Sequence, residues 1–342
     1  MKVAVGLSGG VDSAVCTLLL KRAGYSPVGV FLRMHRVGCE EEAARRAAGE
    51  LGIPFYIKDM TKAFEAQVMA PFAAMYKRGE TPNPCILCNP AVKFRGLLEA
   101  ADALGCERIA TGHYAAIDEH TGLICRIPGQ EKDQSYMLYG LDAACRRRLL
   151  LPLGQMADKE AVRAEAAKMG LSAVGKKDSL DICFLEPGCS HGAFIEAYTG
   201  SPPAPGLIVD PAGRVLGEHE GICHYTVGQR RGLGVAASER LYVSALEPET
   251  NRVVLGPKDA ILADTVVLRD PVLHAPLPEK GLTAKVRYRD KDTAVAVEQA
   301  GEELILWFET PKSAPAPGQS AVIYGGNRVL GGGIIAKAIK KV

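Results

Sequence analysis

The sequence lacks any segment that would hold the protein in a membrane or export it. No run approaches the roughly 20 apolar residues that are needed to cross a bilayer. The apolar start at residues 3–7 is followed at once by polar, glycine-rich sequence, whereas a signal peptide continues with a longer apolar stretch. We therefore expect a cytoplasmic protein with no membrane partner.

Charge of one sign is also scarce. The formal net charge is +2 for 342 residues, which is too small to indicate a nucleic-acid partner, so a polyanion would have to bind at a local patch. With 47% apolar and 23% charged residues the chain has the composition of an ordinary globular protein, which excludes the disordered and fibrous classes. Its length exceeds that of one hydrophobic core and predicts two or three domains.

Cysteines are plentiful, but closely spaced pairs of cysteines are not. In a large chain without an export signal, cysteines more often pack, bind metal or react than form disulfides. Only one Cys-x-x-Cys is present, at Cys85 and Cys88, whereas a structural zinc site usually has two such pairs. A zinc site completed by Cys183, Cys189 or His191 stays open as an alternative. The cysteines that we interpret as structural are Cys16, Cys106, Cys125, Cys145 and Cys223.

No repeat of 20–50 residues is found, which argues against solenoids and propellers. Instead, short apolar runs alternate with helical patterns over the first 200 residues. This alternation is typical of a parallel sheet covered by helices and predicts a doubly wound α/β domain at 1–200. The predicted strands are 2–7, 28–32, 53–57 and 108–110, and the predicted helices are 14–23, 40–51, 61–76 and 158–169, the last with Asp158 as its N-cap.

Proline and glycine cluster at 201–206, and the sequence beyond them changes to short runs of branched residues. We expect a mostly β central domain at 201–260 and a mostly β C-terminal domain at 261–342. The prolines and glycine at 315–318 predict a turn between strands. The predicted strands are 241–246, 252–255, 283–288, 293–297, 304–308 and 320–324.

A glycine-rich loop at residues 8–13 follows the first predicted strand and precedes the first predicted helix. Backbone amides and the helix dipole would converge there on an anion. Gly9 and Gly10 permit close approach of phosphates, Ser8 and Ser13 add hydroxyl donors, and Asp12 suits a magnesium ion or a water bound to it. An ordinary glycine turn is the alternative. The loop lacks the Gly-Lys-Ser ending of γ-phosphate-transferring enzymes, and its string Ser-Gly-Gly-Val-Asp-Ser resembles the loop of enzymes that form adenylates and release pyrophosphate.

Two further stretches carry candidate reactive thiols. The motif at 81–89 places Cys85 and Cys88 at the start of a helical pattern from Ala91, where the helix dipole stabilises a thiolate. Cys183 follows Lys176 and Lys177, which could hold a thiolate or a phosphate. From the residues alone, a buried cysteine in an apolar strand is the better interpretation of Cys183.

A run of alternating cations lies in the C-terminal half. Lys285, Arg287, Arg289 and Lys291 would share one face of a strand, which suits a phosphate backbone. A solvated strand face is the alternative. His113 follows the predicted strand 108–110, and we interpret it as shaping the nucleotide site rather than as a catalytic base.

Several strings occur in order along the chain, at 8–13, 81–89, 110–114, 132–136, 181–184, 224–233, 317–320 and 330–333. Taken together, they resemble the tRNA-specific 2-thiouridylases over residues 3 to about 336. The resemblance implies a PP-loop, adenine nucleotide hydrolase-like domain followed by two mostly β domains, the last of them a tRNA-contacting β-barrel.

The resemblance implies a mechanism. ATP would adenylate the C2 oxygen of the wobble uridine of a tRNA, and sulfur would replace that oxygen, giving 2-thiouridine, AMP and pyrophosphate. Cys183 would carry the sulfur as a persulfide received from a sulfur-relay protein or a cysteine desulfurase. Cys88 would be the second nucleophile and would end in a disulfide with Cys183, which an external thiol must reduce.

The resemblance also assigns binding residues. A target base flipped from the single-stranded anticodon loop would meet Asn83, Pro84 and Cys85. The implied tRNA contacts are Lys132, Asp133, Gln134, Arg287 and Tyr288. The implied ATP contacts are Gly6, Leu7, Ser8, Gly9, Gly10, Val11, Asp12, Ser13, Leu32 and Gly112.

Two departures from the family pattern bear on this assignment. The segment 33–40 is shorter than in many members. Cys85 stands where some members carry aspartate, so Cys85, Cys88 and Cys183 could together hold an iron–sulfur cluster. The competing functions are another adenylating ligase or amidotransferase, and a zinc-stabilised tRNA-binding module without turnover.

Overall fold

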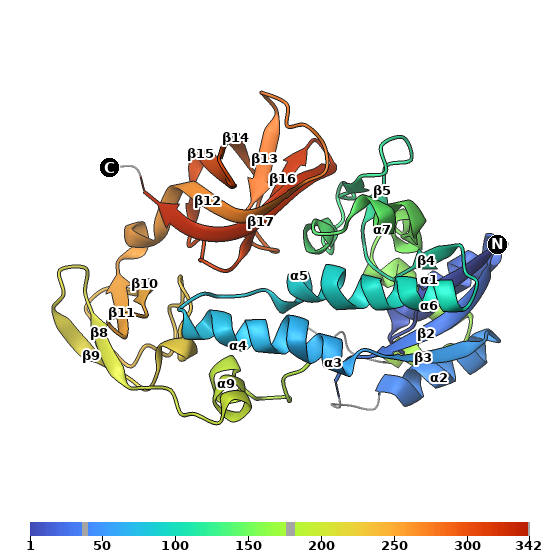
Figure 1. The fold of residues 1–342 in the computed structure, drawn as a ribbon, viewed down its shortest axis with the longest axis horizontal. Coiled ribbons are helices and arrows are strands. Elements are labelled where there is room, and N and C mark those ends of the chain that lie inside the picture. Colours follow the sequence, from blue (N-terminus) through green and yellow to red (C-terminus); the bar gives the residue numbers. More distant parts are fainter. Residues whose placement is uncertain (36–39, 176–181, 341–342) are drawn as a thin grey trace. The chain divides into compact units, whose positions relative to one another are not determined.

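The computed structural model describes residues 1–35, 40–175 and 182–340. The chain forms two compact units (Figure 1): the first comprises 1–68, 85–184 and 327–329, and the second comprises 69–84, 185–326 and 330–342. Lys176, Lys177 and Asp181 lie outside the described residues, as do residues 36–39 of the shortened segment 33–40. Within the described part of the chain, no helix combines the length and the apolarity that a membrane span requires.

The first unit is built on a five-stranded parallel sheet with the order β3-β2-β1-β4-β7. Because β1 pairs in parallel with β2 on one side and β4 on the other, the sheet has its topological switch point at the carboxyl end of β1. The predicted doubly wound domain is confirmed. The strands are β1 (Lys2–Gly6), β2 (Ser26–Arg33), β3 (Phe55–Asp59), β4 (Arg108–Ala110) and β7 (Leu149–Leu150), with a small hairpin of β5 (Ala116–Ile117) and β6 (Ile124–Cys125) beside them.

Helices cover both faces of this sheet. Val3 and Val5 of β1 are fully buried in a core with the helices α1 and α8, whereas Gly6, which points the other way, lies against Leu97 of α6. This alternation is the period-2 pattern of a strand buried on both faces. The helices of the unit are α1 (Val11–Arg22), α2 (Glu40–Leu51), α3 (Thr61–Phe64), α5 (Pro84–Cys88), α6 (Arg95–Ala103), α7 (Ala143–Arg148) and α8 (Lys159–Lys168).

Two of the helical stretches contain π-helical segments. The predicted helix 61–76 consists of α3, a π-helical segment Glu65–Met69 and α4 (Ala70–Lys77). The helix expected from Ala91 already begins at Pro84, a position that favours proline, and it continues through a π-helical segment Asn89–Phe94 into α6. π-helical segments are rare and often mark functional sites.

The second unit combines two helices, a four-stranded sheet and a barrel. Phe72 of α4 meets Phe194 of α9 edge to face at 6.0 Å, and Tyr76 stacks on His191 at 4.6 Å. The sheet has the order β10-β11-β8-β9. The elements are α9 (His191–Thr199), β8 (Gly206–Val209), β9 (Val215–His219), β10 (Tyr242–Glu247) and β11 (Arg252–Gly256).

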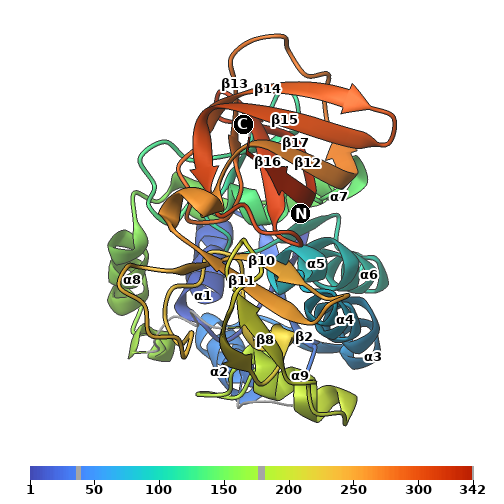
Figure 2. The same cartoon turned by 90° about the vertical axis from the view of Figure 1, so that its left-hand side faces the viewer.

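Six strands close the C-terminal barrel, in the order β12-β15-β14-β13-β16-β17 with β12 paired back to β17. Figure 2 shows these strands curving around a common centre. The expected C-terminal β-barrel is confirmed, as is the turn at 315–318, which joins β15 to β16. The strands are β12 (Leu262–Leu273), β13 (Leu282–Lys285), β14 (Thr293–Ala300), β15 (Glu303–Ser313), β16 (Ser320–Gly325) and β17 (Arg328–Ile339).

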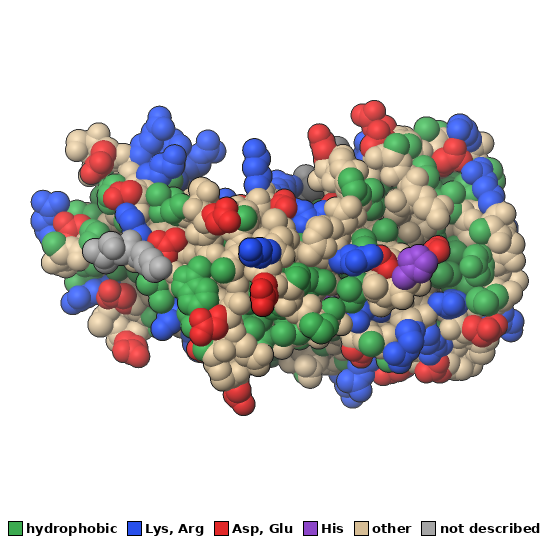
Figure 3. All heavy atoms as spheres, turned by 90° about the horizontal axis from the view of Figure 1, so that it is seen from above, with side chains coloured by type: hydrophobic (Ala, Val, Ile, Leu, Met, Phe, Trp, Pro, Cys, Tyr) green, Lys and Arg blue, Asp and Glu red, His purple; other side chains and the backbone are tan. Residues whose placement is uncertain are grey.

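The predicted strand 283–288 is confirmed only as far as Lys285, and the prediction that four cations share one strand face is wrong. β13 ends at Lys285, and the chain then turns, with the Asp290 amide donating to the Arg287 carbonyl at 3.1 Å. The cause lies in the tertiary structure, because Asp290 forms a buried ion pair with Lys312 at 2.6 Å. Arg287 and Arg289 therefore lie on the turn, whereas Lys285 still belongs to the strand. On the face shown in Figure 3, basic and acidic side chains are interspersed.

Candidate nucleotide and thiol site

The glycine loop lies at the carboxyl end of β1, directly at the switch point. Gly9 has a φ of +74°, and a Cβ added there would lie 2.6 Å from the Ala44 backbone nitrogen of α2. Only glycine fits this left-handed conformation and close approach. The loop can therefore turn sharply from β1 into α1.

Hydroxyl groups tie the loop together. The Ser13 hydroxyl donates to the Gly10 carbonyl at 2.9 Å and accepts from the Ser8 amide at 3.2 Å. Among the described residues, no side chain caps the N-terminus of α1, so its first amides are available to an anion. This arrangement is suited to phosphate groups.

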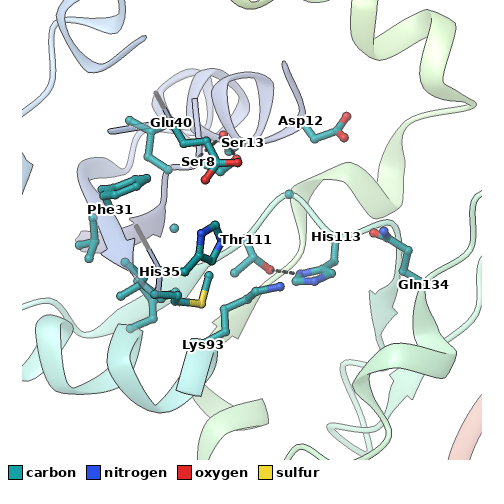
Figure 4. Close-up of a pocket in the computed structure, with 17 residues that line it drawn as sticks. Ser8, Asp12, Ser13, Phe31, His35, Glu40, Lys93, Thr111, His113 and Gln134 are labelled. Carbon is teal, nitrogen blue, oxygen red and sulfur yellow. Dashed lines mark hydrogen bonds between the residues drawn. The ribbon is translucent and has the colours of Figure 1, made fainter. Parts of the chain in front are cut away.

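A cavity of about 270 Å³ opens beside the loop (Figure 4). Seven of the residues implied as ATP contacts line it, whereas Gly9, Gly10 and Val11 build the loop without lining the described wall. His35, Glu40 and Lys93 add charge or hydrogen-bonding capacity to it. The expected contacts in the lining are Gly6, Leu7, Ser8, Asp12, Ser13, Leu32 and Gly112.

Asp12 is held by a lysine and a tyrosine that sequence reasoning missed. Lys159 Nζ lies 2.7 and 2.6 Å from the two carboxylate oxygens, and the Tyr114 hydroxyl donates to Oδ1 at 2.7 Å. The Lys159 side chain is only 9% exposed. In Figure 4 the Asp12 carboxylate points away from Ser8 and Ser13.

His113 forms part of the opposite wall of the cavity. Its Nδ1 lies 2.8 Å from the Thr111 hydroxyl, and its ring stacks on Phe94. Burial, followed by the charge of Lys93, holds the pKa of His113 well below its usual value of 6.5. The imidazole is therefore neutral at neutral pH, in keeping with its expected role in shaping the site.

Lys93, in the π-helical segment, relates the cavity to the thiols. It lines the cavity and points toward His113 in Figure 4. Burial raises the pKa of the Cys88 thiol, while the charge of Lys93 lowers it. Desolvation likewise raises the pKa of Cys183, and the charge of Lys93 again acts in the opposite direction. Lys93 therefore borders the nucleotide cavity and carries a charge that favours the thiolate forms of Cys88 and Cys183.

The three thiols differ in accessibility. Cys88 is buried, with its Sγ 3.8 Å from the Met34 sulfur, whereas Cys85 and Cys183 are exposed. Partial desolvation, followed by the charges of Cys85 and Cys88, raises the pKa of Cys183, and Lys93 acts in the opposite direction. The charges of Cys85 and Cys88 thus act on Cys183, although these cysteines are far apart in the chain.

The residues implied to contact tRNA or the target base differ in burial and in their hydrogen-bond partners. Gln134 lines the nucleotide cavity, and its side chain accepts from the Tyr114 amide at 2.9 Å. Asp133 accepts from the Ser135 hydroxyl at 2.7 Å. Lys132 is half-buried, and Arg287 is exposed on the turn after β13. The expected target-base residue Pro84 is buried and Asn83 half-buried, and both directly precede Cys85.

Metal binding requires several donor side chains that converge on one point. In the described part of the chain, no three histidine, cysteine or acidic side chains are grouped so that they could hold a metal ion. The zinc and iron–sulfur hypotheses therefore find no arranged ligand set among these residues.

A parallel sheet with a Ser-Gly-Gly-Val-Asp-Ser loop at its switch point is typical of PP-loop nucleotide-binding proteins. Family models match in order the tRNA methyl transferase HUP domain at 1–187, the tRNA methyl transferase PRC-barrel domain at 192–257 and the aminomethyltransferase beta-barrel domain at 263–335. The chain belongs to the family of the tRNA-specific 2-thiouridylases.

Relatives that match over nearly their whole length support this assignment. The tRNA-specific 2-thiouridylase MnmA of Lachnoclostridium phytofermentans is 41% identical, over 98% of this chain and 99% of the relative. The MnmA of Syntrophotalea carbinolica is 40% identical, over 98% of both chains. That of Acidithiobacillus ferrooxidans is 41% identical, again over 98% of both.

Proposed function

We propose that the protein is an ATP-dependent tRNA-uridine 2-sulfurtransferase that converts the wobble uridine to 2-thiouridine. The names of its full-length relatives support this activity. The structural observation that supports it is the position of Lys93, which lines the nucleotide cavity and follows Cys88 in one continuous helical stretch. In this proposal the activation site and the sulfur site share one cation.

In the first step, the C2 oxygen of uridine attacks the α-phosphorus of ATP. The new oxygen–phosphorus bond replaces the bond to pyrophosphate, which leaves. The amides at the start of α1, with Ser8 and Ser13, would hold phosphate oxygens, because donors fixed in advance cost little reorganisation during the reaction. The neutral His113 would shape this site without transferring a proton.

Magnesium would neutralise charge on the leaving pyrophosphate. Both oxygens of Asp12 already accept from Lys159, and one also accepts from Tyr114. Direct ligation by Asp12 does not fit this arrangement, and ligation through a water stays a prediction.

In the second step, sulfur replaces the activated oxygen. The outer sulfur of a Cys183 persulfide attacks C2, and AMP leaves with the former C2 oxygen. The Cys88 thiolate then attacks the Cys183 sulfur, so the bond from Cys183 to the transferred sulfur breaks and its electron pair stays with 2-thiouridine. A Cys88–Cys183 disulfide remains, and two electrons from an external thiol reduce it.

The proposed partners follow from these steps. The anticodon loop would bring the wobble uridine to Asn83, Pro84 and Cys85. A sulfur-relay protein or a cysteine desulfurase would load Cys183, whose exposure suits such a transfer. The cytoplasmic location also stays a prediction.

An iron–sulfur cluster on Cys85, Cys88 and Cys183 is the alternative sulfur carrier. The described residues show no such ligand set. Iron and acid-labile sulfide would be measured after anaerobic purification. Iron-free protein that still thiolates would rule the cluster out, whereas activity that depends on bound iron would replace the persulfide scheme.

The direct test is thiolation of unmodified tRNA with ATP and a sulfur donor. Wild type should form 2-thiouridine, and Cys88→Ala and Cys183→Ala should not. Full activity in both variants would contradict the persulfide mechanism. Structural cysteines such as Cys145, which is buried, provide a control, because Cys145→Ala should retain activity.

The same assay separates the competing functions. Another adenylating ligase or amidotransferase would release pyrophosphate without needing Cys88 or Cys183. A zinc-stabilised binding module would hold stoichiometric zinc and consume no ATP.

A further inference from the structure

The chain segment that leads into α5 is bound to the C-terminal barrel. The Thr81 amide donates to the Pro317 carbonyl at 2.7 Å, and the Thr81 carbonyl accepts from the Gln319 side chain at 2.9 Å. Both backbone groups of one buried residue are thus satisfied by a single turn of the barrel. Such pairing fixes the position of the segment more tightly than side-chain packing alone.

A bidentate ion pair adds a second attachment one residue earlier. Arg269 of β12 donates to the two Glu80 carboxylate oxygens at 3.0 and 2.9 Å. The Glu80 side chain is only 14% exposed. Because the guanidinium binds through two parallel bonds, the pair fixes orientation as well as distance.

The barrel turn is shaped for this contact. Gly318 has a φ of +87°, and an added Cβ would lie 2.8 Å from the Thr81 nitrogen. The turn is itself anchored to β17, because Gly318 donates to the Ile335 carbonyl at 2.9 Å and the Ile335 amide donates to the Gln319 carbonyl at 2.7 Å. The string Pro-Gly-Gln at 317–319 thus has a role that neither ATP binding nor sulfur chemistry explains.

The second glycine string, at 331–333, lies against the part of β12 that carries Arg269 of the ion pair. β12 shifts its register against β17 between Arg269 and Val272, and a bulge of this kind re-aims side chains. An added Cβ at Gly331 would clash with the Val272 carbonyl oxygen, and one at Gly333 would lie 3.0 Å from that of Arg269. The glycines therefore let β17 approach the irregular part of β12 that presents Arg269.

We propose that Arg269 and Gln319 are positioning residues for thiolation: they use the barrel to fix the segment that presents Asn83, Pro84 and Cys85 to the target base. Only Pro82 separates Thr81 from Asn83, and proline has little backbone freedom. The position of Thr81 therefore restricts where α5 can begin. This inference rests on the proposed function, because that function assigns the base contacts.

The test compares Arg269→Met and Gln319→Met with Arg214→Met. Arg214 also pairs with an acid, Asp210 at 3.1 Å, but is exposed and far along the chain from the segment. The two test variants should lower kcat for thiolation about tenfold or more, since small misplacements of reacting groups are costly. Their KM for ATP should stay within about twofold of wild type, and Arg214→Met should match wild type in both values.

A second readout does not depend on activity. Hydrogen exchange at the Thr81 amide should be slow in wild type and in Arg214→Met, and at least about tenfold faster in Gln319→Met, since local opening removes protection. If wild type made no 2-thiouridine, the proposed function would fail while this exchange still reported the attachment. Wild-type kcat in both test variants, unchanged exchange in Gln319→Met, or an equal loss in Arg214→Met would overturn the proposal.

Discussion

Gly9 is the residue on which the shape of the nucleotide loop depends. Replacing it with alanine places a Cβ 2.6 Å from the Ala44 backbone nitrogen, at a φ of +74°. We expect Gly9→Ala to lower the free energy of unfolding by about 1–3 kcal/mol and to raise the KM for ATP about tenfold or more. Urea unfolding and pyrophosphate release measure the two effects.

Gly10→Ala is the matched control for Gly9→Ala. The nearest atom to its added Cβ is the Ser8 hydroxyl at 3.5 Å, and its φ is −91°. This variant should therefore stay close to wild type in stability. Equal losses in both variants would show that the loop conformation is not what matters.

Lys93 is a second single residue with a measurable effect, because its charge lowers the pKa of the Cys88 thiol. Burial raises the pKa of Cys88, and Lys93 lowers it, so Lys93→Met should raise that pKa and move the pH profile of Cys88 alkylation to higher pH. At a fixed pH below the thiol pKa, alkylation should slow about threefold or more, because less thiolate is present. Lys93→Arg keeps the charge and should retain the wild-type profile. An unchanged profile in Lys93→Met would remove Lys93 from the thiol site.

At the scale of secondary-structure elements, two ion pairs join the helices α1 and α8, and one of them is more buried than the other. Lys159–Asp12 is mostly buried, whereas Arg22–Glu165, at 2.6 Å, has an arginine that is 48% exposed. Lys159→Met leaves the Asp12 carboxylate without its cation and should cost about 1–3 kcal/mol of stability. Arg22→Met, the control, should cost at most about 1 kcal/mol. Thermal or urea unfolding measures both costs. A larger loss of stability in Arg22→Met than in Lys159→Met would contradict this expectation.

Elements with strong local signals could be predicted from the sequence. β4 lies at the predicted residues, and α8 begins after Asp158, whose side chain accepts from the Ala161 amide at 2.7 Å. β17 could not be predicted, since its run of three glycines disfavours a strand in isolation. It forms because pairing with β12 closes the barrel. The early end of β13 likewise depends on Lys312, which is distant in sequence.

The residues of the site likewise divide into those that a local pattern reveals and those that depend on distant contacts. The loop at 8–13 was recognisable because all of its residues are adjacent. Lys159, by contrast, meets Asp12 across 147 positions, and no local pattern links them. One signal was present, because a lysine directly after an N-cap is unfavourable for the helix dipole. A cation at such a position suggests a partner elsewhere in the fold.

At the scale of the whole molecule, a net charge of +2 leaves tRNA binding to local groups. The turn after β13 exposes Arg287 and is braced by the buried Asp290–Lys312 pair. If Arg287 contacts a phosphate, Arg287→Met should reduce the slope of log affinity against log salt by about one. Filter binding over a salt series measures this slope. An unchanged slope would remove Arg287 from the interface, and Arg214→Met should leave the slope unaltered.

In the proposed scheme, one site activates uridine with ATP and then delivers sulfur from Cys183. Single-turnover reactions of Cys183→Ala with unmodified tRNA separate the two steps when pyrophosphate and 2-thiouridine are measured together. We expect tRNA-dependent pyrophosphate release close to that of wild type and no 2-thiouridine. Formation of 2-thiouridine at the wild-type level in this variant would show that Cys183 is not the sulfur carrier.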